Sequence, residues 1–118
     1  MIKVERKRFK GFVFLGFMER AKHKLVVGDG IEIRKDEERI DVVIWNITGT
    51  SLDRVIELEI TNGKERKSEK VSIPYELFLG EDVCLKFNPA RGGRRVSVGC
   101  YAPLNYEIRR RNYFSKKV

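Results

Sequence analysis

The residues best suited to chemistry in this sequence are arginines near its C-terminal end. Arg109, Arg110 and Arg111 follow one another, and Arg94 and Arg95 stand on the hairpin before them. A guanidinium presents a rigid fork of donors that matches a guanine edge or a phosphate. Arg110 is the first candidate for such a contact. Because neighbours along a strand point to opposite faces, Arg109 and Arg111 would add charge from the other face.

Enzyme chemistry lacks its usual residues here. The single histidine, His23, stands between Lys22 and Lys24 and has no nucleophile or acid partner at a recognisable spacing. Cys84 and Cys100 cannot supply the roughly four ligands of a structural zinc site, and both lie in apolar runs typical of buried thiols. The sequence therefore predicts a protein that is not an enzyme and that uses no metal and no cofactor.

Positive charge gathers at the two ends of the chain. The net charge of +8 divides into +6 for residues 1–24, −4 for residues 25–93 and +6 for residues 94–118. Such a distribution is typical of a nucleic-acid or anionic-surface partner. No apolar run approaches the roughly 18 residues of a membrane span, and the charged N-terminus does not resemble a signal peptide. We expect a cytoplasmic protein.

The elements that position these residues are expected to be short strands. Alternating or β-branched runs, separated by Gly, Asn and Pro, predict an all-β fold, a small barrel or sandwich of short antiparallel strands in one compact domain over residues 1–118. The expected strands are Gly11–Phe17, Lys24–Val27, Ile31–Arg34, Arg39–Asn46, Asp53–Thr61, Lys70–Ile73, Val83–Phe87, Arg94–Tyr101 and Tyr106–Arg109.

Three further segments have weaker patterns. Phe17–His23 could form about one helical turn, and residues 110–117 could form a short helix. Residues 61–70 are polar and charged, which indicates an exposed hairpin tip or a linker.

Two segments of the chain are similar to each other. Residues 25–33 and 77–85 each contain an apolar strand, a glycine with acidic neighbours and a second apolar strand, and residues 40–45 align with residues 96–101. Continued without gaps, this alignment places Leu52 over Ile108 and Arg54 over Arg110. It favours an internal repeat of residues 11–60 and 66–118 joined near 61–70, although any two β-hairpins of similar length look alike.

The second half carries the more specific pattern. Leu77-Phe-Leu-Gly-Glu-Asp-Val-Cys-Leu is followed by a turn and then by Arg95-Val-Ser-Val-Gly-Cys-Tyr-Ala-Pro, with Ile108 and Arg110 beyond. This order resembles the carbon storage regulator (CsrA/RsmA) family of small bacterial RNA-binding translational regulators. Their chains read an apolar strand, Gly-Asp-Asp, a strand, a turn and Val-x-Ile-Gly-x-x-Ala-Pro. An aliphatic residue and an arginine then close the pattern.

The resemblance implies a particular architecture and ligand. Members of this family are intertwined dimers in which strands of one subunit complete the sheet of the other, and they prefer GGA in an RNA loop. Their RNA surface combines the first strand of one subunit with the last strand of its partner. A tandem copy could build the same arrangement as a pseudo-dimer within one chain. The second half has no clear Thr-Arg first strand, so Val55–Thr61 or Lys70–Ile73 would have to serve.

The resemblance and the charge together give a set of candidate RNA-binding residues. Its members are Arg110, Ile108, Ala102, Pro103, Arg54, Arg109, Arg95 and Arg94. Trp45, Tyr101 and Tyr106 are candidate stacking platforms for unpaired bases, although aromatic residues on strands more often belong to the core.

Two hypotheses of different classes remain open. The first is an RNA-binding post-transcriptional or translational regulator that recognises single-stranded or hairpin-loop RNA of the GGA type. The second is a β-sandwich structural or assembly protein, viral or plasmid-borne, that binds nucleic acid or a protein partner without sequence preference. A tandem copy predicts a monomer, whereas an unpaired edge strand predicts a homodimer.

Overall fold

The computed structural model describes residues 4–5, 19–50, 53–80, 83–90 and 95–114. They form ten strands and no helix, so no helix that could cross a membrane occurs among them. The strands are β1 (Val4–Glu5), β2 (Glu19–Leu25), β3 (Asp29–Lys35), β4 (Glu38–Thr48), β5 (Val55–Asn62), β6 (Glu65–Ser72), β7 (Tyr75–Leu79), β8 (Val83–Pro89), β9 (Val96–Tyr101) and β10 (Glu107–Asn112).

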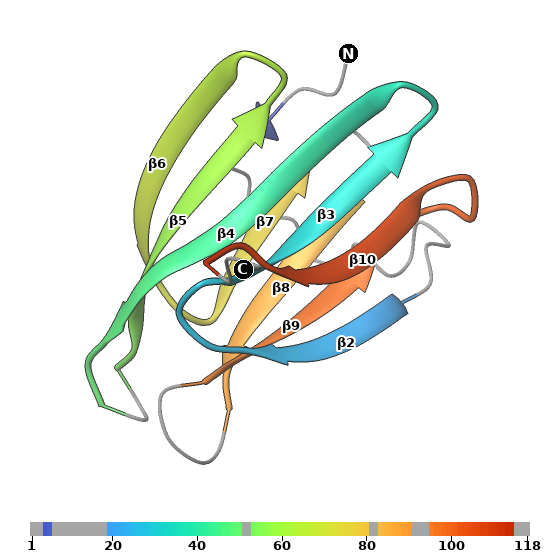
Figure 1. Cartoon of the computed structure of the whole chain (residues 1–118). Helices are drawn as coiled ribbons and strands as arrows, with labels where there is room; N and C mark the ends of the chain where they lie inside the picture. Colours follow the sequence, from blue (N-terminus) through green and yellow to red (C-terminus); the bar gives the residue numbers. More distant parts are fainter. Residues whose placement is uncertain (1–3, 6–18, 51–52, 81–82, 91–94, 115–118) are drawn as a thin grey trace.

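The strands build two antiparallel sheets that face each other (Figure 1). Sheet A has the order β1-β7-β8-β9-β2, and sheet B has the order β10-β3-β4-β5-β6. The expected all-β class is confirmed, and of the two architectures left open, the sandwich is the one that forms, without closure into a barrel. Each sheet keeps two open edges, which become important for the site.

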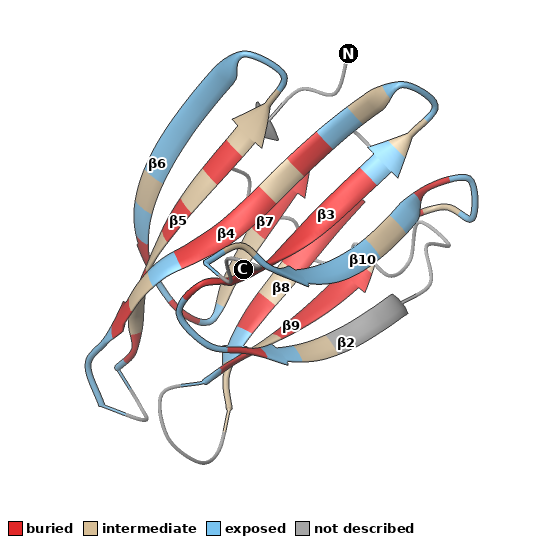
Figure 2. Cartoon of the chain, in the orientation of Figure 1, coloured by how far each residue is buried: buried red, intermediate tan, exposed pale blue. Residues whose placement is uncertain are grey.

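Side-chain alternation explains why the two sheets pack together. In β4, Ile40, Val42 and Ile44 point inward and are buried, and Ile56 and Leu58 of β5 do the same. Figure 2 shows this burial concentrated in the central strands, while β6 and β10 are largely exposed. Removing this apolar surface from water is the main source of stability.

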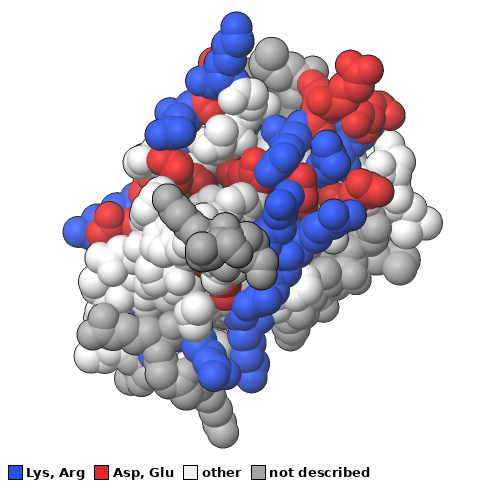
Figure 3. Space-filling model, viewed as in Figure 1, with Lys and Arg blue, Asp and Glu red and all other residues white. Residues whose placement is uncertain are grey.

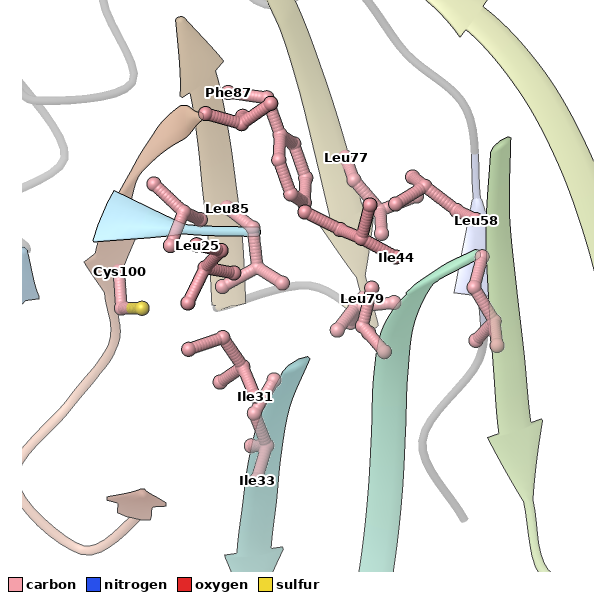
Figure 4. Packing of buried hydrophobic residues seen from close by; sticks show 14 of the residues in the cluster. Leu25, Ile31, Ile33, Ile44, Leu58, Leu77, Leu79, Leu85, Phe87 and Cys100 are labelled. Atoms are coloured by element: carbon pink, nitrogen blue, oxygen red, sulfur yellow. The ribbon is translucent and has the colours of Figure 1, made fainter. Parts of the chain in front are cut away.

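The core is a single cluster supplied by both sheets. Figure 4 shows Leu77 and Phe87 of sheet A meeting Ile44 and Leu58 of sheet B. Cys100 is also buried in this cluster, and Cys84 lies in a small satellite cluster with Phe78. Both thiols are buried, as their apolar sequence surroundings predict.

The two halves of the chain exchange strands. Interchanging β2 with β6, β3 with β7, β4 with β8, β5 with β9 and β1 with β10 converts the order of one sheet into that of the other. The three middle strands of sheet A come from the second half of the chain, and its two outer strands come from the first. Sheet B has the opposite composition. The chain therefore has the topology of an intertwined two-fold pair.

The internal alignment of the sequence pairs different strands from this two-fold pattern. It matches β3 with β8, whereas the two-fold pattern matches β3 with β7. Residues 25–33 pass from sheet A to sheet B between β2 and β3, whereas residues 77–85 form the β7–β8 hairpin within sheet A. An apolar strand, a glycine and a second apolar strand describe both connections equally well. For that reason the sequence pattern alone could not distinguish a crossing from a hairpin.

Two segments expected to be helical are strands. Residues 19–25 form β2 rather than a helical turn, and β10 continues through Arg110 to Asn112 before the described tail ends. Both strands are edge strands rich in Lys and Arg, so they lack the apolar alternation that marks a strand. Residues 61–70 are mostly β5 and β6, with a tip of only two residues at Gly63 and Lys64. The expected strand Gly11–Phe17 lies outside the described residues.

Candidate nucleic-acid interface

One side of the sandwich is formed by two edge strands from different sheets. β2 is the outer strand of sheet A beside β9, and β10 is the outer strand of sheet B beside β3. The two strands contact each other across the gap between the sheets, as Figure 1 shows. We call the surface formed by β2 and β10 the basic edge.

The basic edge is strongly positive in sequence. Its two strands carry six Lys or Arg residues against two Glu, and the six are Arg20, Lys22, Lys24, Arg109, Arg110 and Arg111. Figure 3 shows a band of Lys and Arg side chains running across this side of the molecule. Since β2 comes from residues 19–25 and β10 from residues 107–112, the fold unites the two basic ends of the chain. Such a band attracts polyanions and raises the rate at which they bind.

The register of β10 assigns each arginine to a face. Ile108 lies opposite Ile33 and Arg110 opposite Ile31, so both are on the inner face of sheet B. Arg109 and Arg111 are on the outer face, as alternation predicts. Ile108 is half-buried and packs against the core, so it anchors the strand.

Arg110 is held by a buried carboxylate. Its Nη2 donates to Oδ2 of Asp29 at 2.8 Å, and Asn112 Nδ2 donates to Oδ1 of the same residue at 2.9 Å. The backbone N–H of Val26 also donates to Asp29 Oδ2, at 3.1 Å. Asp29 is only 1% exposed, and such burial of a charge requires these partners.

This pairing corrects the expectation that the Arg110 fork projects freely into solvent. The guanidinium turns toward a carboxylate because Asp29 and Arg110 share the inner face of sheet B. The Arg110 side chain nevertheless remains 45% exposed, and the described residues give its Nε and Nη1 atoms no hydrogen-bond partner. Asp29 therefore fixes the guanidinium at the surface and leaves part of its fork available.

A second buried carboxylate organises the outer face. Glu32, also 1% exposed, lies 3.2 Å from Arg111 Nη1, 3.1 Å from Arg39 Nε and 3.6 Å from Arg34 Nε. Arg39 also pairs with Asp41 at 3.0 Å, so three guanidinium groups meet two carboxylates at this surface. Arg109, opposite Glu32 in the register, is exposed and has no ion pair with any described residue.

The pKa of His23 in β2 is affected by the neighbouring strand β10. Partial burial lowers the pKa of His23 below its usual value, and the positive charge of Arg110 lowers that pKa further. His23 is therefore neutral at neutral pH, and the charge of the basic edge then comes from its lysines and arginines.

The corner formed by Ala102 and Pro103 sets the exit of β10. Ala102 is buried, and the carbonyl of Pro103 accepts a hydrogen bond from the Tyr106 backbone N–H at 3.3 Å. Over residues 102–106 the chain leaves β9 in sheet A and enters β10 in sheet B. Pro at such a corner fixes φ and ends the pairing, so these residues position the arginines of β10, while the Pro103 side chain is half-buried.

Other candidates from the sequence fall outside this group. Arg54 is only 7% exposed, so its proposed role at the surface is wrong. Its carbonyl accepts a hydrogen bond from the Ile73 N–H at 3.0 Å. Arg95 is exposed at the start of β9, the opposite end from Ala102. Arg94 lies outside the described residues.

The aromatic candidates divide between surface and core. Tyr106 is buried in the main cluster, and Tyr101 packs against Phe78 and Cys84. Trp45 is exposed on β4. Of the three residues considered as stacking platforms, only Trp45 presents a largely accessible ring.

Sequence reasoning missed the contribution of β2 and the two buried acids. The missed signal in β2 is that a cation occurs at every second residue, at Arg20, Lys22 and Lys24. This period of two is typical of a strand. Nothing local distinguishes Asp29 and Glu32, because their partners Arg110 and Arg111 lie 81 and 79 residues away in the chain.

The remaining reactive groups of the described residues do not form a second centre. Burial raises the pKa of the Cys84 thiol to about 12, so the thiolate is scarce at neutral pH. No group of three or more His, Cys, Asp or Glu side chains is placed to hold a metal ion within the described ranges.

No protein-family model, no curated protein and no solved structure matches this chain.

Proposed function

We propose that this protein binds single-stranded or hairpin-loop RNA along the basic edge and acts as a post-transcriptional or translational regulator in the cytoplasm. It acts by occupying its target, with no chemical step and no cofactor. The observation that carries the proposal is the meeting of β2 and β10, edge strands of different sheets, which brings Lys24, Arg109, Arg110 and Arg111 to one side of the sandwich.

The exchange of strands between the halves supports the same proposal. The resemblance to carbon storage regulators implies a surface built from the first strand of one subunit and the last strand of its partner. In this chain the basic edge combines β2, a strand of the first half, with β10, the last strand of the second half. A single chain would thus supply both contributions, and we propose that it binds RNA as a monomer.

The contacts at the edge differ in what they can recognise. Lys24 and Arg109 are exposed and are suited to phosphate oxygens, which carry no sequence information. Arg110 is different because Asp29 holds one side of its guanidinium, so its orientation is fixed before a ligand arrives. A fixed fork can form a bidentate contact with a guanine edge at a lower entropic cost.

The opposite side of the sandwich favours one site rather than two. β6 takes the place of β2 in the two-fold pattern, but its cations are interspersed with Glu65 and Glu69. Arg66 lies 3.6 Å from Glu59, and Lys67 lies 3.7 Å from Glu69. These charges also discourage the addition of a further strand to the β6 edge, which counts against assembly through that edge.

The test is a gel-shift series with a hairpin RNA that displays GGA in its loop and a twin with a scrambled loop. We expect tighter binding of the GGA loop and a steep loss of affinity with rising salt. Equal, salt-labile binding of both loops would instead support the alternative of an assembly protein with non-specific nucleic-acid binding. No binding of either RNA would reject the proposal.

Arg110→Lys tests whether the guanidinium reads a base. Lysine keeps the charge beside Asp29 but lacks the fork, so binding to the GGA loop should weaken by about 1–3 kcal/mol while the scrambled loop changes less. Arg66→Lys on β6 is the matched control and should leave both affinities unchanged. Wild-type affinity of Arg110→Lys for the GGA loop would remove Arg110 from the recognition site.

A further inference from the structure

Exposed hydrophobic side chains gather at one place on this molecule. Five large hydrophobic residues are exposed among the described residues, and four of them, Val26, Val27, Trp45 and Phe114, surround Gly28. Val26 and Val27 precede Gly28 in the chain, the Phe114 ring lies over it, and Trp45 contacts Phe114. We call these four residues the apolar platform. The fifth, Leu104, lies apart from them at the corner before β10.

Two backbone contacts hold the platform in place. The N–H of Gly28 donates to the Ile44 carbonyl at 2.8 Å, and the N–H of Tyr113 donates to the Gly28 carbonyl at 2.7 Å. Gly28 has φ 95°, and a Cβ at this position would come within 2.8 Å of the Phe114 ring. Only glycine allows both the turn and the close approach of the ring. The platform is therefore a fixed feature of the fold.

The two aromatic rings of the platform remain accessible. Trp45 is 47% exposed and Phe114 is 42% exposed. Their centroids are 4.7 Å apart and their planes are inclined by 49°, so the rings are not stacked face to face. An accessible aromatic face can stack on an unpaired base of any sequence.

The platform continues the basic edge. Lys24 in β2 comes two residues before Val26, and Phe114 comes two residues after Asn112, where β10 ends. Both strands of the basic edge therefore lead into the platform. Polymers that combine backbone anions with flat apolar groups match a surface that combines cations with exposed rings.

We propose that Trp45, with Phe114 beside it, is a stacking platform for unpaired bases of the RNA whose phosphates lie along the basic edge. This inference rests on the proposed function and adds a second mode of contact to it. The basic edge holds the backbone, and the platform takes up bases that extend beyond the end of β10. Stacking adds affinity with little preference for sequence, whereas Arg110 supplies the selectivity.

Intrinsic fluorescence provides a direct experiment, because Trp45 is the only tryptophan in the chain. The GGA hairpin RNA is titrated into the protein, and Trp45 emission is followed beside a gel shift of the same RNA. We expect quenching that saturates in parallel with the gel shift. A set of RNAs, each with one loop or flanking nucleotide made abasic, should contain at least one that binds without quenching.

Substitutions give the second readout. Trp45→Ala should weaken RNA binding roughly 5- to 150-fold, the range that corresponds to about 1–3 kcal/mol per stacked base. Trp45→Phe keeps a ring and should retain most of the affinity. Leu104→Ala, which removes the exposed hydrophobic residue outside the platform, should bind like the wild type. Circular dichroism verifies that each variant keeps the strand content of the parent protein.

The outcomes separate this inference from the proposed function. If the RNA is shifted in the gel but Trp45 emission is unchanged and Trp45→Ala binds like the wild type, the platform proposal is overturned while RNA binding stands. If no RNA binds, the proposed function and the inference both fail. Quenching by phosphatidylcholine vesicles together with none by RNA would identify the platform as a lipid-contacting patch and would also overturn the inference.

Discussion

At the scale of single residues, the basic edge depends on two buried carboxylates. Asp29 and Glu32 are three positions apart in β3, and this odd spacing directs one to the inside of sheet B and the other to the outside. Each carboxylate binds one arginine of β10: Asp29 accepts from Arg110, and Glu32 accepts from Arg111. Removing one partner of such a buried pair is costly, because the group left behind has lost both water and its counter-charge.

We predict that Asp29→Asn destabilises the protein by about 1–3 kcal/mol in urea unfolding, the typical effect of breaking a buried charged hydrogen bond. The amide has similar size but cannot accept from Val26, Arg110 and Asn112 with a full negative charge. Asp36→Asn is the matched control. Asp36 is exposed in the β3–β4 turn with φ 57°, a conformation that asparagine tolerates.

The same variant separates stability from binding. Without the carboxylate charge, the basic edge is one unit more positive, so RNA affinity at low salt should be equal or higher while its preference for the GGA loop falls. A variant as stable as the wild type would show that Asp29 is not the anchor of β10.

At the scale of elements, the sequence predicted the central strands much better than the edges. The expected strands Arg39–Asn46 and Asp53–Thr61 overlap β4 and β5 closely, because Ile, Val and Leu alternate there with polar residues. β2 was mistaken for a helical turn, since Lys and Arg alternate along it and no run of apolar residues marks it as a strand. Edge strands are specified by their neighbours, which a local pattern cannot reveal.

The candidate site was predictable only in part for a related reason. The sequence placed Arg109 at the end of the last expected strand and Arg110 directly after it, and in the structure both belong to β10 at the basic edge. Arg54 was chosen from an alignment whose register is one strand away from the topology, and it is buried. The partner of Arg110 depends on the pairing of β10 with β3, which joins distant parts of the chain.

The contact between β2 and β10 predicts a measurable shift in the pKa of His23. His23 is the only histidine, so its proton NMR signal is readily assigned. We expect a pKa below 6.5, caused first by burial and then by the charge of Arg110. Arg110→Gln should raise the pKa toward 6.5 without reaching it, because burial remains. Arg109→Gln, on the opposite face of β10, should leave the pKa unchanged.

The sign of the accompanying stability change follows from linkage. The unfolded chain takes up a proton near pH 6.5, and the folded chain takes it up only at lower pH. His23 therefore contributes full stability above pH 6.5, and that contribution is lost as the pH falls through the folded pKa. A His23 pKa of 6.5 or above in the wild type would mean that β2 and β10 are separated in solution.

At the scale of the whole molecule, each sheet contains strands from both halves of the chain. β3, β4 and β5 form the middle of sheet B, but its outer strands β6 and β10 belong to the second half. β7, β8 and β9 form the middle of sheet A, bordered by β1 and β2 of the first half. The buried core lies between the middle strands of the two sheets, so each half covers the apolar face of the other.

This topology predicts that the halves fold only together. Fragments 1–63 and 64–118, divided at the tip of the β5–β6 hairpin, each retain a three-stranded middle whose apolar face has lost its cover and two strands that have lost their partners. Either fragment alone should show no cooperative transition in urea. An equimolar mixture should regain the near-ultraviolet circular dichroism of the intact chain, with a midpoint that rises with protein concentration, since association is then coupled to folding.

The control is the intact chain with a protease site inserted between Gly63 and Lys64, an exposed tip with open space around Gly63. It should unfold like the parent before cleavage and like the mixture afterwards. A cooperative transition in one isolated fragment would show that this half is a domain by itself, and the intertwined arrangement that brings β2 beside β10 would then not be what holds the sandwich together.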